Sequence, residues 1–468
     1  MYSSVEDGAT DSADAVLDRP HPADLVLAMG EPAVRERLRL VEHRTANGEF
    51  NGSAEVGGPV MYRYPAVMMP EFQRAVTDAV APRGVDPILT LDPFVGSGTT
   101  MCEASLRGFP FVGADVNPLA ILICRVKSGP FQIAAFRSAM DRVTRFARKA
   151  RLQARVEFAS RDKWFRLDVQ LELARLRHAI EQEGHAPTRR FLWVVLAETA
   201  RLCSNSRLTT VKLHLRKTEE LGRTLHTVDV FERVGLRNAA GLETWLNDLT
   251  ARGMVAQGNW LRSDVRLMQG DVRSSDTLPS ASTCRFGLVL TSPPYGDNRS
   301  TIPYGEASYL PTQWIDQQDL GLATLPENAF AVDAASLGGS RVGASIAADG
   351  LAQRSSAFAR TAKALSSQPD DRLKRVAGFV RDLDNAIEQI HQRLEVGAWQ
   401  VWTVGSRTVG GVKVPLSAIL LELQAERGVQ LVGSLTRSLP TKRRAAARND
   451  RAPRMTDEQV LVLHNASS

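Results

Sequence analysis

Residues 88–100 constrain the fold more strongly than any other part of this 468-residue chain. They read ILTLDPFVGSGTT, an apolar run that ends in an acid and continues into a glycine-rich turn. This pattern predicts a buried first β-strand, a tight loop and the start of a helix. A strand that leads directly into a helix is the first half of a βαβ unit, so the pattern favours an α/β fold.

The glycine-rich turn does not match two common phosphate-binding motifs. A nicotinamide fingerprint would need a third small residue where Met101 stands. A phosphate loop would carry a lysine after Gly98, but Thr99 and Thr100 follow instead. Asp92 would repel a pyrophosphate, whereas it would attract a ligand with a sulfonium and an α-ammonium group.

Two later strands are also predicted to end in an acid. Residues 111–115 form an apolar run that closes at Asp115 and is followed by Asn117, and residues 265–271 close at Asp271. In a doubly wound sheet, an acid after the second strand binds ribose hydroxyls. Asp271 is placed to accept a hydrogen bond from an adenine amine. One such aspartate is more often a helix cap, but three in succession indicate a ligand site.

The second decisive motif is Ser292-Pro293-Pro294-Tyr295, which follows the apolar run LVLT. Two prolines cannot continue a β-ladder, so the strand must end there and the backbone is stiff. The motif places a hydroxyl, a main-chain carbonyl and an aromatic ring where open α/β sheets bind ligands. The Ser292 hydroxyl and the Pro293 carbonyl can accept both hydrogens of an exocyclic amine, and Tyr295 can stack on a planar base.

Together these two motifs resemble the S-adenosylmethionine-dependent DNA methyltransferases that modify exocyclic amines. The TSPPY stretch is similar to the N4-cytosine branch, because the N6-adenine branch more often has Asp at the position of Ser292. Residues 62–70 resemble the cofactor-side segment that precedes the first strand in this family. The likeness spans roughly residues 60 to 468, although the stretch after Asn117 is unusually long.

The resemblance implies an α/β protein with a Rossmann-like class I methyltransferase sheet and helices on both faces. It implies S-adenosyl-L-methionine as cofactor and Ser292, Pro293, Pro294 and Tyr295 as the catalytic group. The cofactor-binding residues that it implies are Tyr64, Pro65, Asp92, Phe94, Gly96, Ser97, Gly98, Thr99, Thr100, Asp115, Asn117, Asp271 and Val272.

The expected activity is site-specific methyl transfer to the N4 amine of cytosine in double-stranded DNA, with the base flipped out of the helix. Three alternatives stay open. They are an N6-adenine DNA methyltransferase, an RNA base-amine methyltransferase and a non-catalytic DNA-binding subunit. A cognate restriction endonuclease is a further partner that this family allows.

The sequence predicts three parts. Residues 1–50 are read as a polar arm, residues 51–128 and 262–468 as the catalytic domain, and residues 129–261 as a helical insertion that is a candidate DNA-recognition region. Helices are expected at 134–155, 167–182 and 189–202. Residues 331–367, rich in Gly, Ala and Ser, predict a long loop. An amphipathic helix follows, with Val376, Phe379, Leu383, Ile387, Ile390 and Leu394 on one face, and then a buried strand at 398–404.

Basic residues gather in two places. Residues 204–217 alternate basic and apolar side chains, which suits either a DNA backbone contact or a solvated edge strand. The second cluster lies near the C-terminus and suits phosphate contacts. A formal net charge of +6 is compatible with a polyanionic partner. The expected DNA contacts are Arg207, Lys212, Arg216, Lys217, Arg299, Lys442, Arg443 and Arg444.

The cysteines indicate a reducing compartment. Four are scattered along the chain, with neither a C-x-x-C pair nor a histidine cluster, so no metal site is expected. No apolar stretch is long enough to span a bilayer, and the acidic opening does not resemble a signal peptide. The sequence therefore predicts a cytoplasmic protein with no membrane partner.

Overall fold

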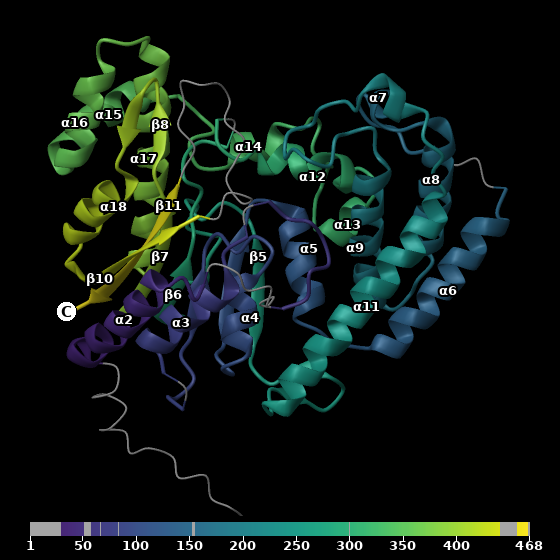
Figure 1. Cartoon of the computed structure of the whole chain (residues 1–468), viewed down its shortest axis with the longest axis horizontal. Coiled ribbons are helices and arrows are strands. Elements are labelled where there is room, and N and C mark those ends of the chain that lie inside the picture. Colours follow the sequence, from purple (N-terminus) through teal and green to yellow (C-terminus); the bar gives the residue numbers. More distant parts are fainter. Residues whose placement is uncertain are drawn as a thin grey trace, which may run out of the picture.

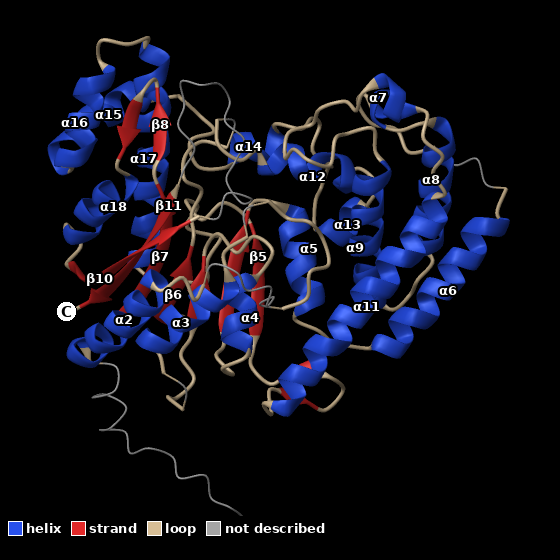
Figure 2. Ribbon diagram, viewed as in Figure 1, coloured by secondary structure: helices blue, strands red, loops and turns tan. Residues whose placement is uncertain are grey.

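A computed structural model describes residues 30–50, 58–65, 67–82, 84–151, 155–298, 300–439 and 456–466. Its centre is a seven-stranded sheet with the strand order β10-β11-β7-β6-β1-β2-β5 (Figures 1 and 2). The parallel strands are β1 (Thr90–Asp92), β2 (Phe111–Asp115), β5 (Val265–Gln269), β6 (Phe286–Thr291) and β7 (Leu394–Gly405). Strand β11 (Asp457–Asn465) lies antiparallel between β7 and β10 (Val429–Ser438). The predicted α/β class is confirmed.

The order of the strands places a ligand site between β1 and β6. From β1 the chain moves outward through β2 to β5, and from β6 it moves in the opposite direction to β7. Thr90 of β1 pairs with Phe111 on one side and with Leu288 on the other, so all three strands point the same way. Open sheets of this kind bind ligands beyond the carboxyl ends of the strands, at the point where the order reverses.

Helices cover both faces of the sheet, as predicted. Side chains alternate along a strand, so Leu288 and Leu290 of β6 enter one hydrophobic core and Val289 enters the other. The first core is covered by α2 (Glu31–Ala46), α3 (Pro70–Val80), α4 (Thr99–Ser105) and α5 (Pro118–Lys127). The second is covered by α15 (Ala344–Arg354), α16 (Ser356–Leu365), α17 (Asp370–His391) and α18 (Leu416–Ala425).

Part of the predicted polar arm belongs to the body of the protein. Helix α2 packs on α3 and β10, and it buries Val34, Leu38 and Val41 in the first core. These three residues have the i, i+4, i+7 spacing of a single helix face. Residues 1–29 of the arm lie outside the described residues.

The insertion forms a helical bundle beside the sheet (Figure 1). Its long helices are α6 (Ile133–Lys149), α8 (Leu167–Glu181), α9 (Ala186–Cys203) and α11 (Thr227–Ala251). The first three lie at the predicted positions with shifted ends, whereas α11 was not predicted. Shorter elements connect them, namely α7 (Arg161–Trp164), α10 (Thr218–Leu221), β3 (Val255–Ala256) and β4 (Trp260–Leu261). Phe136 and Phe191 stack with ring centroids 4.6 Å apart inside the bundle.

The prediction of a long loop at 331–367 is wrong. This stretch contains α14 (Ala331–Ala335), α15 and α16. Alanine has the highest helix propensity, and the glycines that suggested a loop lie mainly between the helices, where Gly338 and Gly343 have positive φ angles. The Ser355 side chain caps α16 by accepting a hydrogen bond from the Phe358 amide at 3.0 Å.

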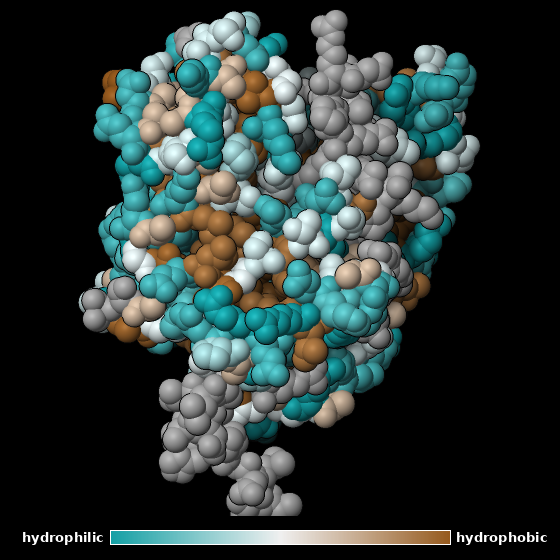
Figure 3. Space-filling view, turned by 60° about the vertical axis from the view of Figure 1, so that its left-hand side comes forward, coloured by the Kyte–Doolittle hydropathy of each residue, from teal (hydrophilic) through white to brown (hydrophobic). Residues whose placement is uncertain are grey.

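The next two predicted elements are present. Helix α17 buries Val376, Phe379 and Leu383 as expected, but Leu394 begins β7 and does not belong to the helix. Figure 3 shows one side of the molecule, hydrophilic over most of its area with apolar side chains gathered in the middle. Among the described residues, no helix combines the length and apolar character needed to cross a membrane.

Candidate active site

A cavity of about 2110 Å³ opens at the carboxyl ends of the parallel strands. Its walls come from the loops after β1, β2, β5 and β6, from residues 60–70 and 204–214, and from the hairpin of β8 (Arg407–Val409) and β9 (Val412–Val414). Single small-molecule sites usually occupy roughly 300–1,000 Å³. This cavity is therefore large enough to hold a cofactor and a second ligand next to each other.

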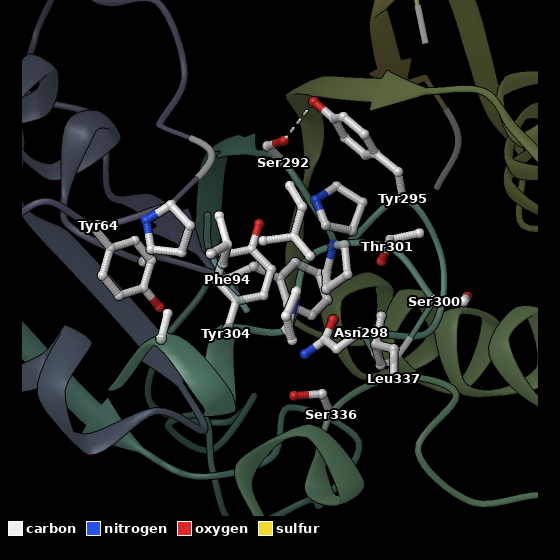
Figure 4. Close-up of a pocket in the computed structure, with 18 of the residues that line it drawn as sticks. Tyr64, Phe94, Ser292, Tyr295, Asn298, Ser300, Thr301, Tyr304, Ser336 and Leu337 are labelled. Atoms are coloured by element: carbon white, nitrogen blue, oxygen red, sulfur yellow. Dashed lines mark hydrogen bonds between the residues drawn. The ribbon is translucent and has the colours of Figure 1, made fainter. Parts of the chain in front are cut away.

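The Ser292–Tyr295 motif lies on the cavity wall directly after β6. Ser292 Oγ lies 3.3 Å from the Tyr295 hydroxyl, and Figure 4 shows both side chains at the upper edge of the cavity. The Tyr295 hydroxyl donates to Glu458 Oε1 at 3.0 Å. Burial, followed by the charge of Glu458, raises the pKa of Tyr295 well above its usual range, so the phenol stays protonated. Arg437 forms an ion pair with the other oxygen of Glu458.

Asp115 faces the same cavity from the end of β2. Its Oδ2 accepts a hydrogen bond from the Gly96 amide at 2.9 Å, and its Oδ1 accepts one from the Asn117 amide at 2.8 Å. Burial raises the pKa of Asp115 to about 6, while the two amides favour the charged form. Each carboxylate oxygen still has a lone pair for a ligand hydroxyl.

Asn117 joins the β2 end to residues 60–70. Its side-chain oxygen caps α5 by accepting from the Leu119 amide at 3.1 Å, and its Nδ2 donates to the Tyr64 hydroxyl at 3.2 Å. The Tyr64 and Tyr304 rings lie 5.8 Å apart between centroids, and Phe94 lines the same part of the cavity (Figure 4). Aromatic faces attract cationic groups, so this part of the wall suits a sulfonium.

The glycine-rich turn packs against α5. Gly96 and Gly98 have φ angles of +51° and +85°, a region that glycine adopts without strain. A Cβ atom at Gly98 would lie 2.9 Å from Cys124 Sγ, so the position has no room for a side chain. The buried Lys127 donates to the Ser97 carbonyl at 2.8 Å and thereby secures the turn against α5.

Asp92 lies beneath the cavity and does not line its wall, in contrast to the predicted direct contact with a sulfonium or ammonium group. Its carboxylate accepts hydrogen bonds from the Phe94 amide at 3.0 Å, the Thr291 hydroxyl at 2.7 Å and the Thr100 hydroxyl at 2.5 Å. Burial raises the pKa of Asp92 to about 6, and these hydrogen bonds oppose the shift. Asp92 therefore ties the ends of β1 and β6 to the start of α4.

Asp271 is on the wall, but Arg273 occupies much of its carboxylate. Arg273 Nε lies 2.9 Å from both oxygens of Asp271, and Nη2 lies 2.5 Å from Oδ2. Arg273 also pairs with Asp382 at 2.5 Å. Fewer lone pairs thus remain for an adenine amine than the sequence indicated.

The structure brings most of the expected residues together. Those that line the cavity are Tyr64, Pro65, Phe94, Gly96, Ser97, Thr99, Asp115, Asn117, Asp271, Val272, Ser292, Pro293, Pro294, Tyr295, Arg207 and Lys212. Those that do not line it are Asp92, Gly98, Thr100, Arg216 and Lys217. Arg299, Lys442, Arg443 and Arg444 lie outside the described residues.

Residues 204–217 form neither a regular strand nor a helix up to α10. They hold one isolated β-bridge, between Ser206 and Leu215. Arg216 does not line the cavity, and it donates to the Ser204 carbonyl at 3.4 Å and pairs with Glu220 at 3.5 Å. The edge-strand alternative is therefore wrong for this segment as a whole.

Several wall residues were missed from sequence. Asn298 donates through Nδ2 to Asp333 at 3.1 Å, and its Oδ1 has no hydrogen-bond partner within the described part of the chain. Arg407 on β8 pairs with Asp297 at 3.0 Å and carries the wall beyond Tyr295. Asn298 was within reach of sequence reasoning because it follows the SPPY motif closely. Glu458 carried no local signal, since it is 163 positions from Tyr295.

The donor set fits S-adenosylmethionine. Asp115 offers acceptors for ribose hydroxyls, and Tyr64, Phe94 and Tyr304 offer aromatic surface for a sulfonium. A doubly wound sheet with this cavity at its switch point defines a Rossmann-like α/β protein with a ligand site.

Comparison with known proteins narrows the class. The chain is 25% identical over 420 residues to the type II methyltransferase M.MvaI of Kocuria varians, an alignment that covers 86% of this chain and 90% of that one. No protein-family model matches the chain. The protein is a methyltransferase, and its methyl donor is S-adenosylmethionine.

Two solved structures of the rRNA methyltransferase aviRa from Streptomyces viridochromogenes also align with the chain. Both alignments cover 90% of this chain and 93% of that one, at 12% and 13% identity. The TM-scores are 0.32 and 0.31, too low for any argument about fold or substrate.

Proposed function

We propose that this protein transfers a methyl group to the N4 amine of cytosine in double-stranded DNA. The observation that carries the proposal is the position of Ser292, whose hydroxyl lines the cavity at the switch point of the sheet. The extended similarity to a type II methyltransferase supports DNA as the substrate. The choice of cytosine over adenine rests on serine in place of aspartate at position 292.

The chain supplies positioning and hydrogen-bond acceptors for this reaction. The lone pair of an exocyclic amine is delocalised into the base, so the amine is a poor nucleophile. The Ser292 hydroxyl oxygen and the Pro293 carbonyl can accept its two N–H groups, which draws the nitrogen towards tetrahedral geometry. When bound, S-adenosylmethionine supplies a methyl group on a good leaving group.

Tyr295 is the proposed stacking residue for a flipped base. Extrusion of a base costs a few kcal/mol, and base–aromatic stacking returns roughly 1–3 kcal/mol. Tyr295 lines a cavity of about 2110 Å³, larger than one small-molecule ligand requires. Lys212 and Arg207, on the wall formed by the insertion, are proposed phosphate contacts.

A direct test uses purified protein, methyl-labelled S-adenosylmethionine and mixed-sequence duplex DNA. We expect labelled N4-methylcytosine on nucleoside analysis of the digested product. Label in N6-methyladenine would show that the target base is adenine and not cytosine. Label in RNA alone would refute the proposal that DNA is the substrate. Absence of transfer to DNA and RNA, with cofactor binding intact, would indicate a non-catalytic subunit.

The proposed catalytic group is tested by Ser292→Ala and Tyr295→Ala. We expect each to lower the single-turnover rate of transfer at least a hundredfold, because acceptor and stacking contacts act on the base. Affinity for S-adenosylmethionine, measured by calorimetry, should stay within about threefold of wild type. Ser282→Ala, in an exposed loop, is the matched control and should leave both quantities unchanged. Loss of cofactor affinity in both site variants would show that the loop belongs to the cofactor half.

A further inference from the structure

The direction of the hydrogen on the Ser292 hydroxyl decides whether this residue can accept from a base amine, a role that rests on the proposed function. A serine hydroxyl is both a donor and an acceptor. If its hydrogen pointed at a base amine, donor would face donor and the amine would be repelled. We propose that Glu458, held by Arg437, orients the Tyr295 and Ser292 hydroxyls so that Ser292 presents only lone pairs to the target amine.

Ser292, Tyr295 and Glu458 form a hydrogen-bond chain, and Glu458 sets the direction in which its hydrogens point. An ionised Glu458 can only accept, so the Tyr295 hydroxyl must donate its single hydrogen to Oε1, at 3.0 Å. The Tyr295 oxygen is then left with lone pairs alone. The contact between Ser292 Oγ and the Tyr295 oxygen, at 3.3 Å, therefore has Ser292 as its donor. Both lone pairs of Ser292 Oγ remain available to the cavity.

Arg437 holds the Glu458 carboxylate in place. Its side chain is only 5% exposed, and its guanidinium pairs with Glu458 Oε2, the oxygen that Tyr295 does not use. Glu458 itself is 14% exposed. An arginine guanidinium has only donors, so the Glu458 oxygen that faces it acts as an acceptor. The two residues come from neighbouring positions on β10 and β11, where Arg437 pairs with Glu458 in the sheet register.

This arrangement gives Glu458 and Arg437 a positioning role. Both residues line the same cavity, and in the proposed complex they act on Ser292 through Tyr295, which lies between Glu458 and Ser292. An aspartate at position 292 would be an acceptor without any help. A serine needs a partner that accepts its hydrogen, and the C-terminal strands provide one.

Glu458→Gln tests the direction of the hydrogen-bond chain, because the glutamine side chain has almost the same shape as glutamate. Arg437 has only donors, so the new amide must turn its oxygen towards Arg437 and its nitrogen towards Tyr295. Tyr295 would then donate to Ser292, and the Ser292 hydrogen would turn to the amine. We expect the single-turnover rate of transfer to fall ten- to a hundredfold, with S-adenosylmethionine affinity within about threefold. Glu426→Gln, which removes a glutamate paired with Arg354 at 2.6 Å, is the matched control.

A double variant separates orientation from a general structural role. Tyr295→Phe keeps the ring but removes the hydroxyl that links Ser292 to Glu458. Adding Glu458→Gln to this variant should therefore produce no further loss in the rate of transfer. A further tenfold loss in the Tyr295→Phe background would overturn the proposal, because Glu458 would then act through something other than the hydroxyl of Tyr295. Wild-type-like transfer by Glu458→Gln alone would overturn it as well.

A substrate-free measurement keeps the inference separate from the proposed function. The chain has six tyrosines, and the Cζ signal of Tyr295 in ¹³C-tyrosine NMR is assignable with Tyr295→Phe. We expect this signal to move in Glu458→Gln and to stay in place in Glu426→Gln. An unmoved signal would refute the hydrogen-bond chain even if the enzyme methylates DNA. A moved signal in a protein that methylates neither DNA nor RNA would refute the proposed function alone.

Discussion

Two aspartates at strand ends have pKa values shifted in the same direction, but their positions in the site differ. Burial raises the pKa of both Asp92 and Asp115 to about 6, yet only Asp115 lines the cavity. The sequence predicted that both strands end in an acid and that both acids meet a ligand. It could not show that Thr291, 199 positions away, would occupy an oxygen of Asp92. The role of a strand-terminal acid thus depends on a partner that only the fold brings close.

Asp92→Asn should change the pH dependence of stability. The folded pKa of Asp92 is raised above its unfolded value, so its contribution is fully present below about pH 4 and is lost as pH rises through about 6. The loss amounts to at most about 3 kcal/mol for a shift of this size. Denaturant unfolding should show that wild type loses stability relative to Asp92→Asn between pH 4 and pH 7. A constant difference in stability between the two proteins across that pH range would contradict the raised pKa of the buried Asp92 carboxyl.

Asp115→Asn should act on the cofactor. Its carboxylate accepts from two loop amides and has lone pairs left for ligand hydroxyls, so an amide nitrogen there would face donors. Hydrogen bonds to charged groups contribute about 1.5–3 kcal/mol, so we expect a ten- to hundredfold weaker affinity for S-adenosylmethionine in calorimetry. The Asp92→Asn variant is the control, and equal losses in both would mean that the two acids share one role.

At the scale of elements, local pattern predicted some segments and not others. Helices α6, α8 and α9 and the core strands have strong apolar periodicity, and each was found close to its predicted position. Strands β10 and β11 were not predicted, and the Gly-, Ala- and Ser-rich composition of residues 331–367 predicts a loop where the structure has α14–α16. Long-range pairing, which joins β11 to both β7 and β10, leaves no local trace in the sequence.

The β8–β9 hairpin gives the cavity a second basic wall. Lys413 on β9 is exposed and lines the cavity, as does Lys212 of the insertion, although the two segments are far apart in sequence. If duplex DNA occupies this opening, Lys413→Ala should weaken binding to all sequences by a similar factor. The slope of log affinity against log salt should fall by about 0.9 for one lost phosphate contact. An unchanged slope would place the DNA elsewhere.

At the scale of the whole molecule, the insertion and the sheet share one core. The cluster that contains Leu288 and Leu290 of β6 also contains Phe136, Phe191 and Trp193 of the insertion. The sequence predicted the position and helical character of the insertion but not the shared core. An apolar helix face shows that the helix packs against something, without showing against which element. The insertion is therefore part of the body of the protein as well as a wall of its cavity.

Shared packing predicts cooperative unfolding. Helix α9 of the bundle contacts α5, so separating the bundle from the sheet would expose apolar surface of the shared core, and the two should lose structure together. Differential scanning calorimetry should show one main transition, with tryptophan fluorescence and far-UV circular dichroism changing at the same temperature. Two resolved transitions, each seen by a different probe, would show that the bundle folds independently.

The interior position of β11 has a consequence for how the enzyme becomes active. Strand β10 precedes β11 in the chain but lies beyond it in the sheet, so β10 joins the sheet only through β11, which pairs with β7. Such non-local pairing is slow because a long loop must close first. Because β11 carries Glu458, Ser292 acquires its proposed orientation only when this strand has joined the sheet. Fast methyl transfer would then require the complete sheet, and a partly folded chain with every motif in place would transfer the methyl group slowly.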